Sequence, residues 1–312
     1  MTEDKDKELY DCLIIGGGPA GFTAGIYAAR YKLKTILFTK EMGGTSAKAH
    51  KVENYPGFSS IAGIELMQKF REQYEEYDVE LQADEVKSVR KGDDGIFTVM
   101  ADDREYKGRA VVLALGKKRR ELGVPGEKEF AGKGVSYCAT CDGMFFTDKV
   151  TAVVGGSDAA VMAALLLSPH AEKVYLIYRR DQLRAEPIWT ERVVKDPKVE
   201  IIYNTNVVEV KGEGTVKSVM LDKEHEGSQE LALDGLFIEV GADPEVSLAK
   251  ELGVELDEKD RIKINTQAAT NVPGVSAAGD VTVGLCEMEQ IVTAAAEGAT
   301  AAYGVYEYLL GK

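Results

Sequence analysis

The sequence is poor in cysteine and has no excess of basic charge. Four cysteines in 312 residues are too few for the disulfide framework of a small secreted domain. Lys and Arg number 38 against 52 Asp and Glu, which gives a formal net charge of −14. We expect no nucleic acid and no anionic membrane as main partner, because each would require a basic surface.

Long apolar runs are also missing. No stretch reaches the roughly 18 apolar residues of a membrane span, so no membrane partner is expected. Residues 1–8 are charged and lack the apolar segment of a signal peptide. We therefore expect a cytoplasmic protein, in which a close pair of cysteines is more often catalytic or metal-binding than structural.

The order of apolar runs and glycines indicates an α/β fold. One unit has a strand over residues 12–15, a glycine turn over 16–21, a helix over 22–31 and a strand over 35–38. A similar unit has a strand over 152–154, a turn at 155–156, a helix over 159–167 and a strand over 174–178. We also expect a helix over 64–77, short strands over 79–112 and a long Ala-rich helix from about Glu287.

The first glycine turn, Gly16-Gly17-Gly18-Pro19-Ala20-Gly21, matches G-x-G-x-x-G between a strand and a helix. In that context the first glycine permits the turn, the second admits a pyrophosphate and the third allows close helix packing. Glu41 follows the next strand and is a candidate for binding a ribose hydroxyl. The alternative is a glycine turn in an ordinary α/β protein.

The sharpest motif is Cys138-Ala139-Thr140-Cys141-Asp142-Gly143. Two thiols at this spacing can close a small disulfide, and one can attack a substrate disulfide while the other resolves it. Asp142 is next to the pair and can move the proton that each exchange requires. The motif predicts redox catalysis.

Two other interpretations of the cysteine pair are weaker. A zinc site needs two more ligands, but Cys12 lies in the first strand, Cys286 is distant, and His50, His170 and His225 form no cluster in the sequence. We expect no metal. An inert core pair is disfavoured because glycine and aspartate suit a turn.

The second glycine turn, Gly155-Gly156-Ser157-Asp158-Ala159-Ala160, resembles G-x-G-x-x-A with serine at the second key position. A Cβ there crowds the approach of a pyrophosphate. Arg179, Arg180 and Arg184 follow the next strand and suit a 2′-phosphate, which favours NADPH over NADH. The alternative is a solvated basic turn.

Together these motifs closely resemble the low-molecular-weight thioredoxin reductases, nearly from end to end. The resemblance also includes Val52-Glu53-Asn54-Tyr55-Pro56-Gly57 and Ala278-Gly279-Asp280. In the glutathione-reductase type, a C-x4-C pair lies near the first nucleotide turn and a catalytic histidine near the C-terminus. Here no cysteine follows Gly44 closely, and no histidine follows His225.

The resemblance implies two Rossmann-like domains of the flavoprotein disulfide reductase type, the second inserted in the first. An FAD domain would comprise residues 1–117 and 245–312, and an NADPH domain 118–244. FAD would contact Gly16, Gly18, Pro19, Ala20, Gly21, Glu41, Gly44, Asn54, Gly116, Gly279, Asp280, Gln290 and Ile291. NADPH would contact Gly155, Gly156, Ser157, Asp158, Ala159, Arg179, Arg180 and Arg184.

The resemblance also assigns roles. Cys141 would be the thiolate beside the flavin, Cys138 the attacker of thioredoxin and Asp142 the general acid/base, in a homodimer. Electrons would pass from NADPH to FAD, then to the cysteine pair, then to thioredoxin or a similar small dithiol protein. Gly116 and Gly241 would lie at hinges between the domains.

Several departures from the family pattern leave the electron donor open. They are Ser157 for glycine, Leu115 for threonine, Glu289 for a basic residue and Thr45-Ser46 for Gln-Leu. Some relatives accept electrons from ferredoxin or a deazaflavin, although the arginine trio favours NADPH. The reductase component of a peroxiredoxin system usually has an added N-terminal domain that this sequence lacks. A non-catalytic redox-sensing flavoprotein is disfavoured by the intact C-x-x-C-D.

Overall fold

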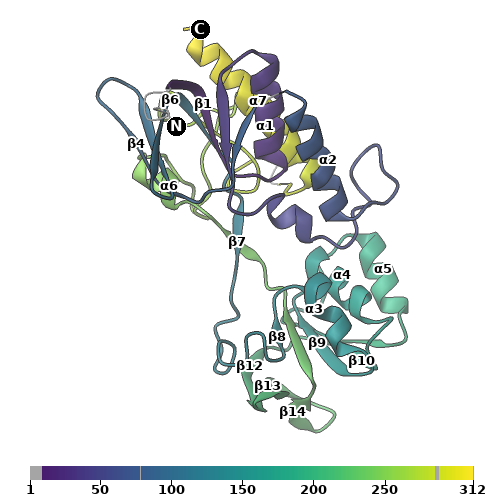
Figure 1. Cartoon of the computed structure of the whole chain (residues 1–312). Coiled ribbons are helices and arrows are strands. Elements are labelled where there is room, and N and C mark those ends of the chain that lie inside the picture. Colours follow the sequence, from purple (N-terminus) through teal and green to yellow (C-terminus); the bar gives the residue numbers. More distant parts are fainter. Residues whose placement is uncertain (1–8, 78, 285–287, 312) are drawn as a thin grey trace, which may run out of the picture. The chain divides into compact units, whose positions relative to one another are not determined.

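The computed structural model describes residues 9–77, 79–284 and 288–311. It divides into two compact units (Figure 1). Unit 1 comprises Met1–Lys118 and Asp243–Lys312, and unit 2 comprises Arg119–Ala242. Unit 2 is therefore an insertion in the sequence of unit 1.

Unit 1 is built on a seven-stranded sheet of order β3-β2-β1-β6-β5-β4, with β17 paired to β6. The strands are β1 (Leu9–Ile15), β2 (Thr35–Phe38), β3 (Glu80–Gln82), β4 (Val86–Lys91), β5 (Phe97–Ala101), β6 (Arg104–Leu113) and β17 (Val275–Ala277). Strand β5 pairs antiparallel with both β4 and β6, and the other pairs of this sheet are parallel. The helical segments are α1 (Pro19–Arg30), η2 (Gly44–Lys48), α2 (Gly63–Glu75), α6 (Ser247–Glu251) and α7 (Ile291–Leu309).

Both faces of this sheet are buried, which explains the continuous apolar run of β1. Cys12 and Ile14 belong to a core that includes residues of α1, α2 and α7, while Leu13 and Ile15 belong to a core that includes α6. Alternate side chains of a strand point to opposite faces, so both sets must be apolar. Helices α1, α2 and α7 lie on one face of the sheet (Figure 1).

Unit 2 is built on a parallel five-stranded sheet of order β11-β10-β9-β15-β8. Its strands are β8 (Val135–Ser136), β9 (Val150–Val154), β10 (Lys173–Tyr178), β11 (Val199–Tyr203) and β15 (Gly235–Ile238). Its helical segments are α3 (Ala139–Asp142), η3 (Gly143–Phe146), α4 (Asp158–Leu167) and α5 (Pro187–Lys195). An antiparallel sheet contains β12 (Val207–Glu213), β13 (Thr215–His225) and β14 (Ser228–Ala232).

The two faces of the parallel sheet in unit 2 are also covered. Val153 and Val174 share a core with residues of α4 and α5. Ala152 and Val154 share the other core with residues of β12 and β13. This layering holds the carboxyl ends of β9, β10 and β15 in one fixed row, where nucleotide sites of such sheets lie.

The two chain crossings between the units pair with each other. They form β7 (Lys117–Arg119) and β16 (Ala242–Pro244). Gly116 and Gly241, next to these strands, have φ values of 64° and 104°. Both values lie in the left-handed region that glycine adopts without steric cost.

The elements predicted from the sequence are present, with one shift. Helix α7 begins at Ile291, not at about Glu287, which lies outside the described residues. The helix begins where Gln290 and Thr293 form a reciprocal capping box. Across the described ranges, none of the helices combines the length and the apolar character that crossing a membrane requires.

Candidate active site

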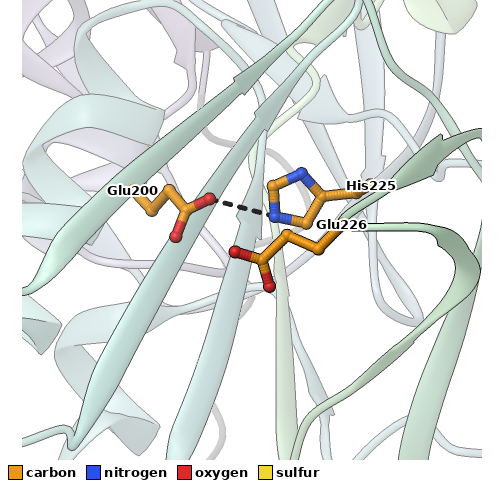
Figure 2. Close-up of side chains that lie close together, drawn as sticks. All are labelled: Glu200, His225 and Glu226. Atoms are coloured by element: carbon orange, nitrogen blue, oxygen red, sulfur yellow. Dashed lines mark ion pairs between the residues drawn. The ribbon is translucent and has the colours of Figure 1, made fainter.

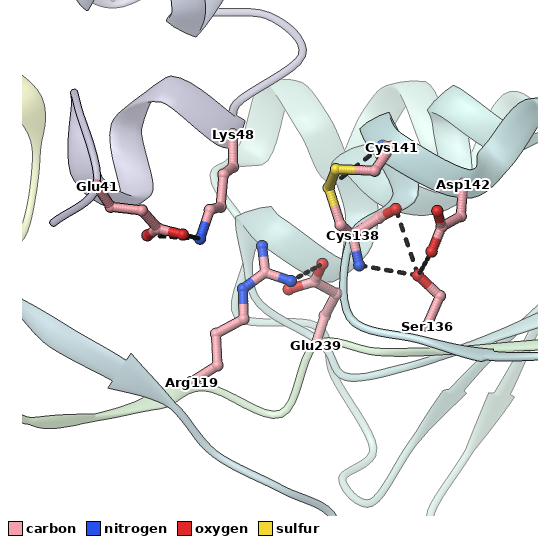
Figure 3. The surroundings of a disulfide bond; sticks show 8 residues. All are labelled: Glu41, Lys48, Arg119, Ser136, Cys138, Cys141, Asp142 and Glu239. Carbon is pink, nitrogen blue, oxygen red and sulfur yellow. Dashed lines mark hydrogen bonds and ion pairs between the residues drawn. A yellow bond between two sulfur atoms is a disulfide. The ribbon is translucent and has the colours of Figure 1, made fainter. Parts of the chain in front are cut away.

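The cysteine pair closes a disulfide at the start of α3 (Figure 3). The two Cα atoms are 5.3 Å apart, which lies within the usual range for disulfides. Cys138 is the N-cap residue, and its Sγ accepts the N–H of Cys141 at 3.2 Å. Cys138 is half-buried and Cys141 is exposed, so the pair can be reached from solvent.

Asp142 is held by a residue that sequence reasoning missed. The Ser136 hydroxyl donates to Asp142 Oδ2 at 2.6 Å, and the Cys138 N–H donates to Ser136 Oγ at 3.0 Å. Ser136 ends β8 and is only 5% exposed. Its position two residues before the first cysteine was the available signal.

The first glycine turn leaves room for a ligand at one position only. A Cβ on Gly16 would lie 2.1 Å from the Ala114 carbonyl oxygen, and one on Gly21 would lie 1.8 Å from that of Gly16. A Cβ on Gly18 would meet nothing within 4 Å. Packing therefore explains Gly16 and Gly21, whereas the open space at Gly18 fits a dinucleotide pyrophosphate such as that of FAD.

Other residues predicted to bind FAD either adjoin this turn or contact one another. Pro19 and Ala20 begin α1, and a Cβ on Gly44 would lie 3.6 Å from Gly18 Cα. Asn54 Nδ2 donates to Gln290 Oε1 at 3.0 Å, just before Ile291 starts α7.

Glu41 has a partner that the sequence did not predict. Lys48 Nζ lies 2.8 Å from each of its carboxylate oxygens. The Glu41 side chain is 66% exposed. The carboxylate can therefore exchange the lysine for a hydroxyl ligand at small cost.

The Gly279-Asp280 segment lies in a pocket with several charged side chains. The Gly279 N–H donates to Glu297 Oε2 at 2.8 Å, and Glu297 is buried. The pKa of Asp280 is raised to about 6, mainly by burial and also by the nearby Glu289, while Lys117 opposes the rise. Lys117 forms an ion pair with Glu289. Gly279, Asp280 and Glu289 line this pocket together.

The second glycine turn has the backbone of the first. Ser157 has φ −96° and ψ −179°, close to the φ −85° and ψ −172° of Gly18. A Cβ on Gly155 would lie 2.3 Å from the Glu239 carbonyl oxygen, and one on Gly156 would lie 2.5 Å from the Tyr178 ring. The serine side chain thus stands where the first turn has open space.

The loop after β10 is fastened to the second turn. The Arg184 N–H donates to the Gly156 carbonyl at 2.7 Å. Asp158 Oδ1, at the start of α4 beside Ala159, accepts the Glu186 N–H at 2.7 Å.

The three arginines of this loop are exposed. Among the residues that the structure describes, no ion pair engages Arg179, Arg180 or Arg184. Their guanidinium groups are therefore available to a phosphate.

A buried carboxylate follows β15 at the same edge of the sheet. Glu239 lies 3.6 Å from Arg119, and its side chain is 12% exposed. Burial raises the pKa of Glu239, and Arg119 opposes the rise. Sequence reasoning missed this pair, because its two residues lie far apart in the chain.

His225 lies in a charged group that the sequence did not predict (Figure 2). Its Nε2 is 3.0 Å from Glu200 Oε1, and Glu226 is close by. Lys173 Nζ already pairs with the other oxygen of Glu200 at 2.6 Å, and this hydrogen bond raises the pKa of Lys173. Lys173 and His225 each approach one oxygen of Glu200, so the group connects β11 with β13.

Residues 10–298 match the pyridine nucleotide-disulphide oxidoreductase family. The thioredoxin reductase of Bacillus subtilis is 41% identical over 99% of this chain and 96% of its own, and that of Listeria innocua is 40% identical over 97% and 95%. The solved thioredoxin reductase of Lactococcus lactis has a TM-score of 0.92 and 37% identity, covering 97% of this chain and 100% of its own.

The chain belongs to the thioredoxin reductase family of these oxidoreductases. The predicted resemblance and the predicted fold class are thereby confirmed. The cysteine pair, Asp142 and the two glycine turns thus occur in a member of a family of flavin-dependent disulfide reductases.

Proposed function

We propose that this protein is a thioredoxin-disulfide reductase that passes electrons from NADPH through FAD and the Cys138–Cys141 disulfide to thioredoxin. The observation that carries the proposal is the closed disulfide beside Asp142. The disulfide lies in unit 2, which also contains the second glycine turn and the loop of Arg179, Arg180 and Arg184 that is hydrogen-bonded to it. A disulfide so close to a nucleotide turn favours catalysis over a structural role.

We assign FAD to residues 1–117 and 245–312 and NADPH to residues 118–244. Gly18 leaves the open space for the FAD pyrophosphate, and Asn54 and Asp280 supply polar groups around it. Arg179, Arg180 and Arg184 would hold the 2′-phosphate of NADPH. When bound, FAD supplies a two-electron carrier between a nicotinamide and a disulfide.

The reduced pair then reacts in two sulfur exchanges. The Cys138 thiolate attacks the disulfide of thioredoxin, and one thioredoxin sulfur leaves as a thiolate. Cys141 attacks Cys138, which re-forms the enzyme disulfide and releases the second thioredoxin sulfur. Asp142 takes the proton of each enzyme thiol as that thiol attacks, Cys138 first and Cys141 second, and passes it to the departing thioredoxin sulfur. Two electrons and two protons thus reach thioredoxin.

We also propose a cytoplasmic homodimer as the working state. The acidic composition and the small number of cysteines support the compartment. The resemblance to the low-molecular-weight thioredoxin reductases supports the homodimer, and sedimentation of the purified protein tests it.

Anaerobic reduction of the bound flavin tests the donor. NADPH, NADH and reduced ferredoxin are supplied side by side, and bleaching of the flavin absorbance is followed. We expect fast bleaching with NADPH, followed by reduction of added thioredoxin. Bleaching by ferredoxin alone would replace the donor in the proposal and keep the disulfide chemistry.

A further inference from the structure

The Ser136 hydroxyl lies between the carboxylate and the backbone of the redox site (Figure 3). Ser136 is paired with Phe237 of β15, so its place is set by the parallel sheet. The hydroxyl contacts Asp142 Oδ2 at 2.6 Å, the Cys138 N–H at 3.0 Å and the Cys138 carbonyl oxygen at 3.4 Å.

A hydroxyl has one proton to donate, so these contacts have a fixed direction. The Cys138 N–H can only donate, which makes Ser136 Oγ its acceptor. The short distance to Asp142 identifies the carboxylate as the acceptor of the hydroxyl proton, because the carbonyl is 0.8 Å farther away. Asp142 Oδ2 is thereby engaged, and Oδ1 is the oxygen left for proton exchange.

We propose that Ser136 is a positioning residue for the proton transfer of Asp142. Its hydroxyl, itself held by the Cys138 N–H, fixes the carboxylate next to the cysteine pair. Asp142 can then release its proton to a departing sulfur and recover it from an enzyme thiol. This inference rests on the proposed function, because Asp142 acts there as the general acid/base.

Other titratable groups on the elements next to α3 could also affect a pH profile. Glu239 with Arg119 follows β15, and Asp158 starts α4, which packs on α3. Tyr137 donates to Glu127 at 2.8 Å. A substitution at Ser136 removes none of these groups, so a shift that it causes reports on Asp142 and on the reduced thiols of the cysteine pair.

The chain offers a matched control for removal of this hydroxyl. Ser218 is 6% exposed and donates to Glu230 Oε1 at 2.6 Å, in the antiparallel sheet of unit 2. Both Ser136→Ala and Ser218→Ala therefore delete a hydroxyl that donates to a carboxylate. Only Ser136 lies next to the cysteine pair.

The test is the pH dependence of kcat for thioredoxin reduction. In Ser136→Ala we expect kcat to fall about tenfold and its pH profile to shift from that of the wild type, because the carboxylate loses the hydroxyl that holds it. Ser218→Ala should keep the wild-type profile. An unshifted profile in Ser136→Ala would overturn the proposal.

A double-mutant cycle separates positioning from structural support. If Ser136 acts through Asp142, Ser136→Ala adds no further loss in an Asp142→Asn background. Multiplicative losses would contradict the proposal. Should Ser136→Ala fail to fold, Ser136→Thr and Ser136→Val form a second pair of nearly equal volume, in which only threonine should keep the wild-type profile.

Exchange of the Cys138–Cys141 disulfide with dithiothreitol distinguishes the two possible failures. The reaction is followed by alkylation and mass measurement, and it requires neither NADPH nor thioredoxin. A wild-type protein that exchanges with dithiothreitol but does not reduce thioredoxin refutes the proposed function. The Ser136 proposal still predicts slower, pH-shifted exchange in Ser136→Ala, and an unchanged exchange refutes it.

Discussion

Arg184 and Gly156 are joined through their backbones, with the Arg184 N–H 2.7 Å from the Gly156 carbonyl oxygen. A second link, from the Glu186 N–H to Asp158, fixes the same loop to the start of α4. These two hydrogen bonds fix the backbone of the loop to the glycine turn, so the backbone that bears the exposed guanidinium groups has a defined position next to that turn. Such preorganisation favours recognition of a phosphate placed on that turn.

Replacing Arg179 and Arg184 by glutamine should raise the KM for NADPH by about 10–100-fold, the value of one or two charge-assisted hydrogen bonds. The KM for NADH should change little, because NADH lacks the 2′-phosphate. Steady-state kinetics with both dinucleotides measure this. Arg90→Gln, which removes an exposed ion pair with Glu105 in unit 1, is the control. Equal losses for both dinucleotides would refute the assignment.

Gly18→Ala should weaken the binding of FAD without damaging the fold. The added Cβ meets no protein atom within 4 Å, and Gly18 has an extended backbone that alanine adopts. We expect the free energy of unfolding of the flavin-free variant to equal that of the flavin-free wild type or to exceed it by up to about 1 kcal/mol. FAD affinity should fall on the order of 10–100-fold. Flavin absorbance and denaturant unfolding measure the two effects.

Gly21→Ala is the matched contrast, because its Cβ would lie 1.8 Å from the Gly16 carbonyl oxygen. It should reduce the stability of the flavin-free protein itself. If Gly18→Ala destabilised the apoprotein as strongly, the open space at Gly18 would not be a ligand site.

Cys138→Ser should abolish thioredoxin reduction but leave reduction of the flavin by NADPH, because the sulfur lies downstream of the flavin. Cys12→Ala is the control. Cys12 is fully buried in β1, and burial raises its pKa to about 12, so it forms no thiolate at neutral pH. The Cys12→Ala variant should reduce thioredoxin at the wild-type rate, and its free energy of unfolding should fall by roughly 1 kcal/mol through lost packing. Loss of both half-reactions in Cys138→Ser would refute the order of electron transfer.

Asp280→Asn should stabilise the flavin-free protein in a pH-dependent way. The folded pKa of about 6 lies above the ordinary value of 3.8, so the protonated form is favoured and stability is lost as pH rises from 4 to 6. The variant lacks this penalty and should gain up to about 3 kcal/mol at pH 7.5, but only about 1 kcal/mol at pH 4.5. Urea unfolding at both values measures the gain. If the gain in the free energy of unfolding were the same at both pH values, its cause would be packing and not the charge of Asp280.

The parts of the fold that the sequence predicted are those with local causes. The apolar run of β1, the glycines after it and the alanines of α1 lie next to one another in the chain. The disulfide was predictable for the same reason, because Cys138 and Cys141 are three residues apart. Helix α7 was placed too early because the signal for its start is the capping pair of Gln290 and Thr293, not the Ala-rich composition.

Long-range contacts could not be predicted in this way. The contact of Glu200 with His225 depends on how β11 and β13 pack, and the periodicity of the sequence does not reveal that packing. The pairing of Arg119 with Glu239 joins positions 120 residues apart in sequence. Ser136 is the exception: it is close to Cys138 in the chain, but its role depends on a turn geometry that the sequence does not reveal.

The insertion of unit 2 within unit 1 sets the order in which a growing chain can fold. Residues 119–242 are complete in sequence while unit 1 still lacks β17 and α7. Unit 1 closes late because α7 packs on α1 at Gly298, where a Cβ would lie 2.1 Å from the Ala20 carbonyl oxygen. During synthesis the redox unit can therefore fold first, while the unfinished flavin unit exposes the apolar face that α7 later covers.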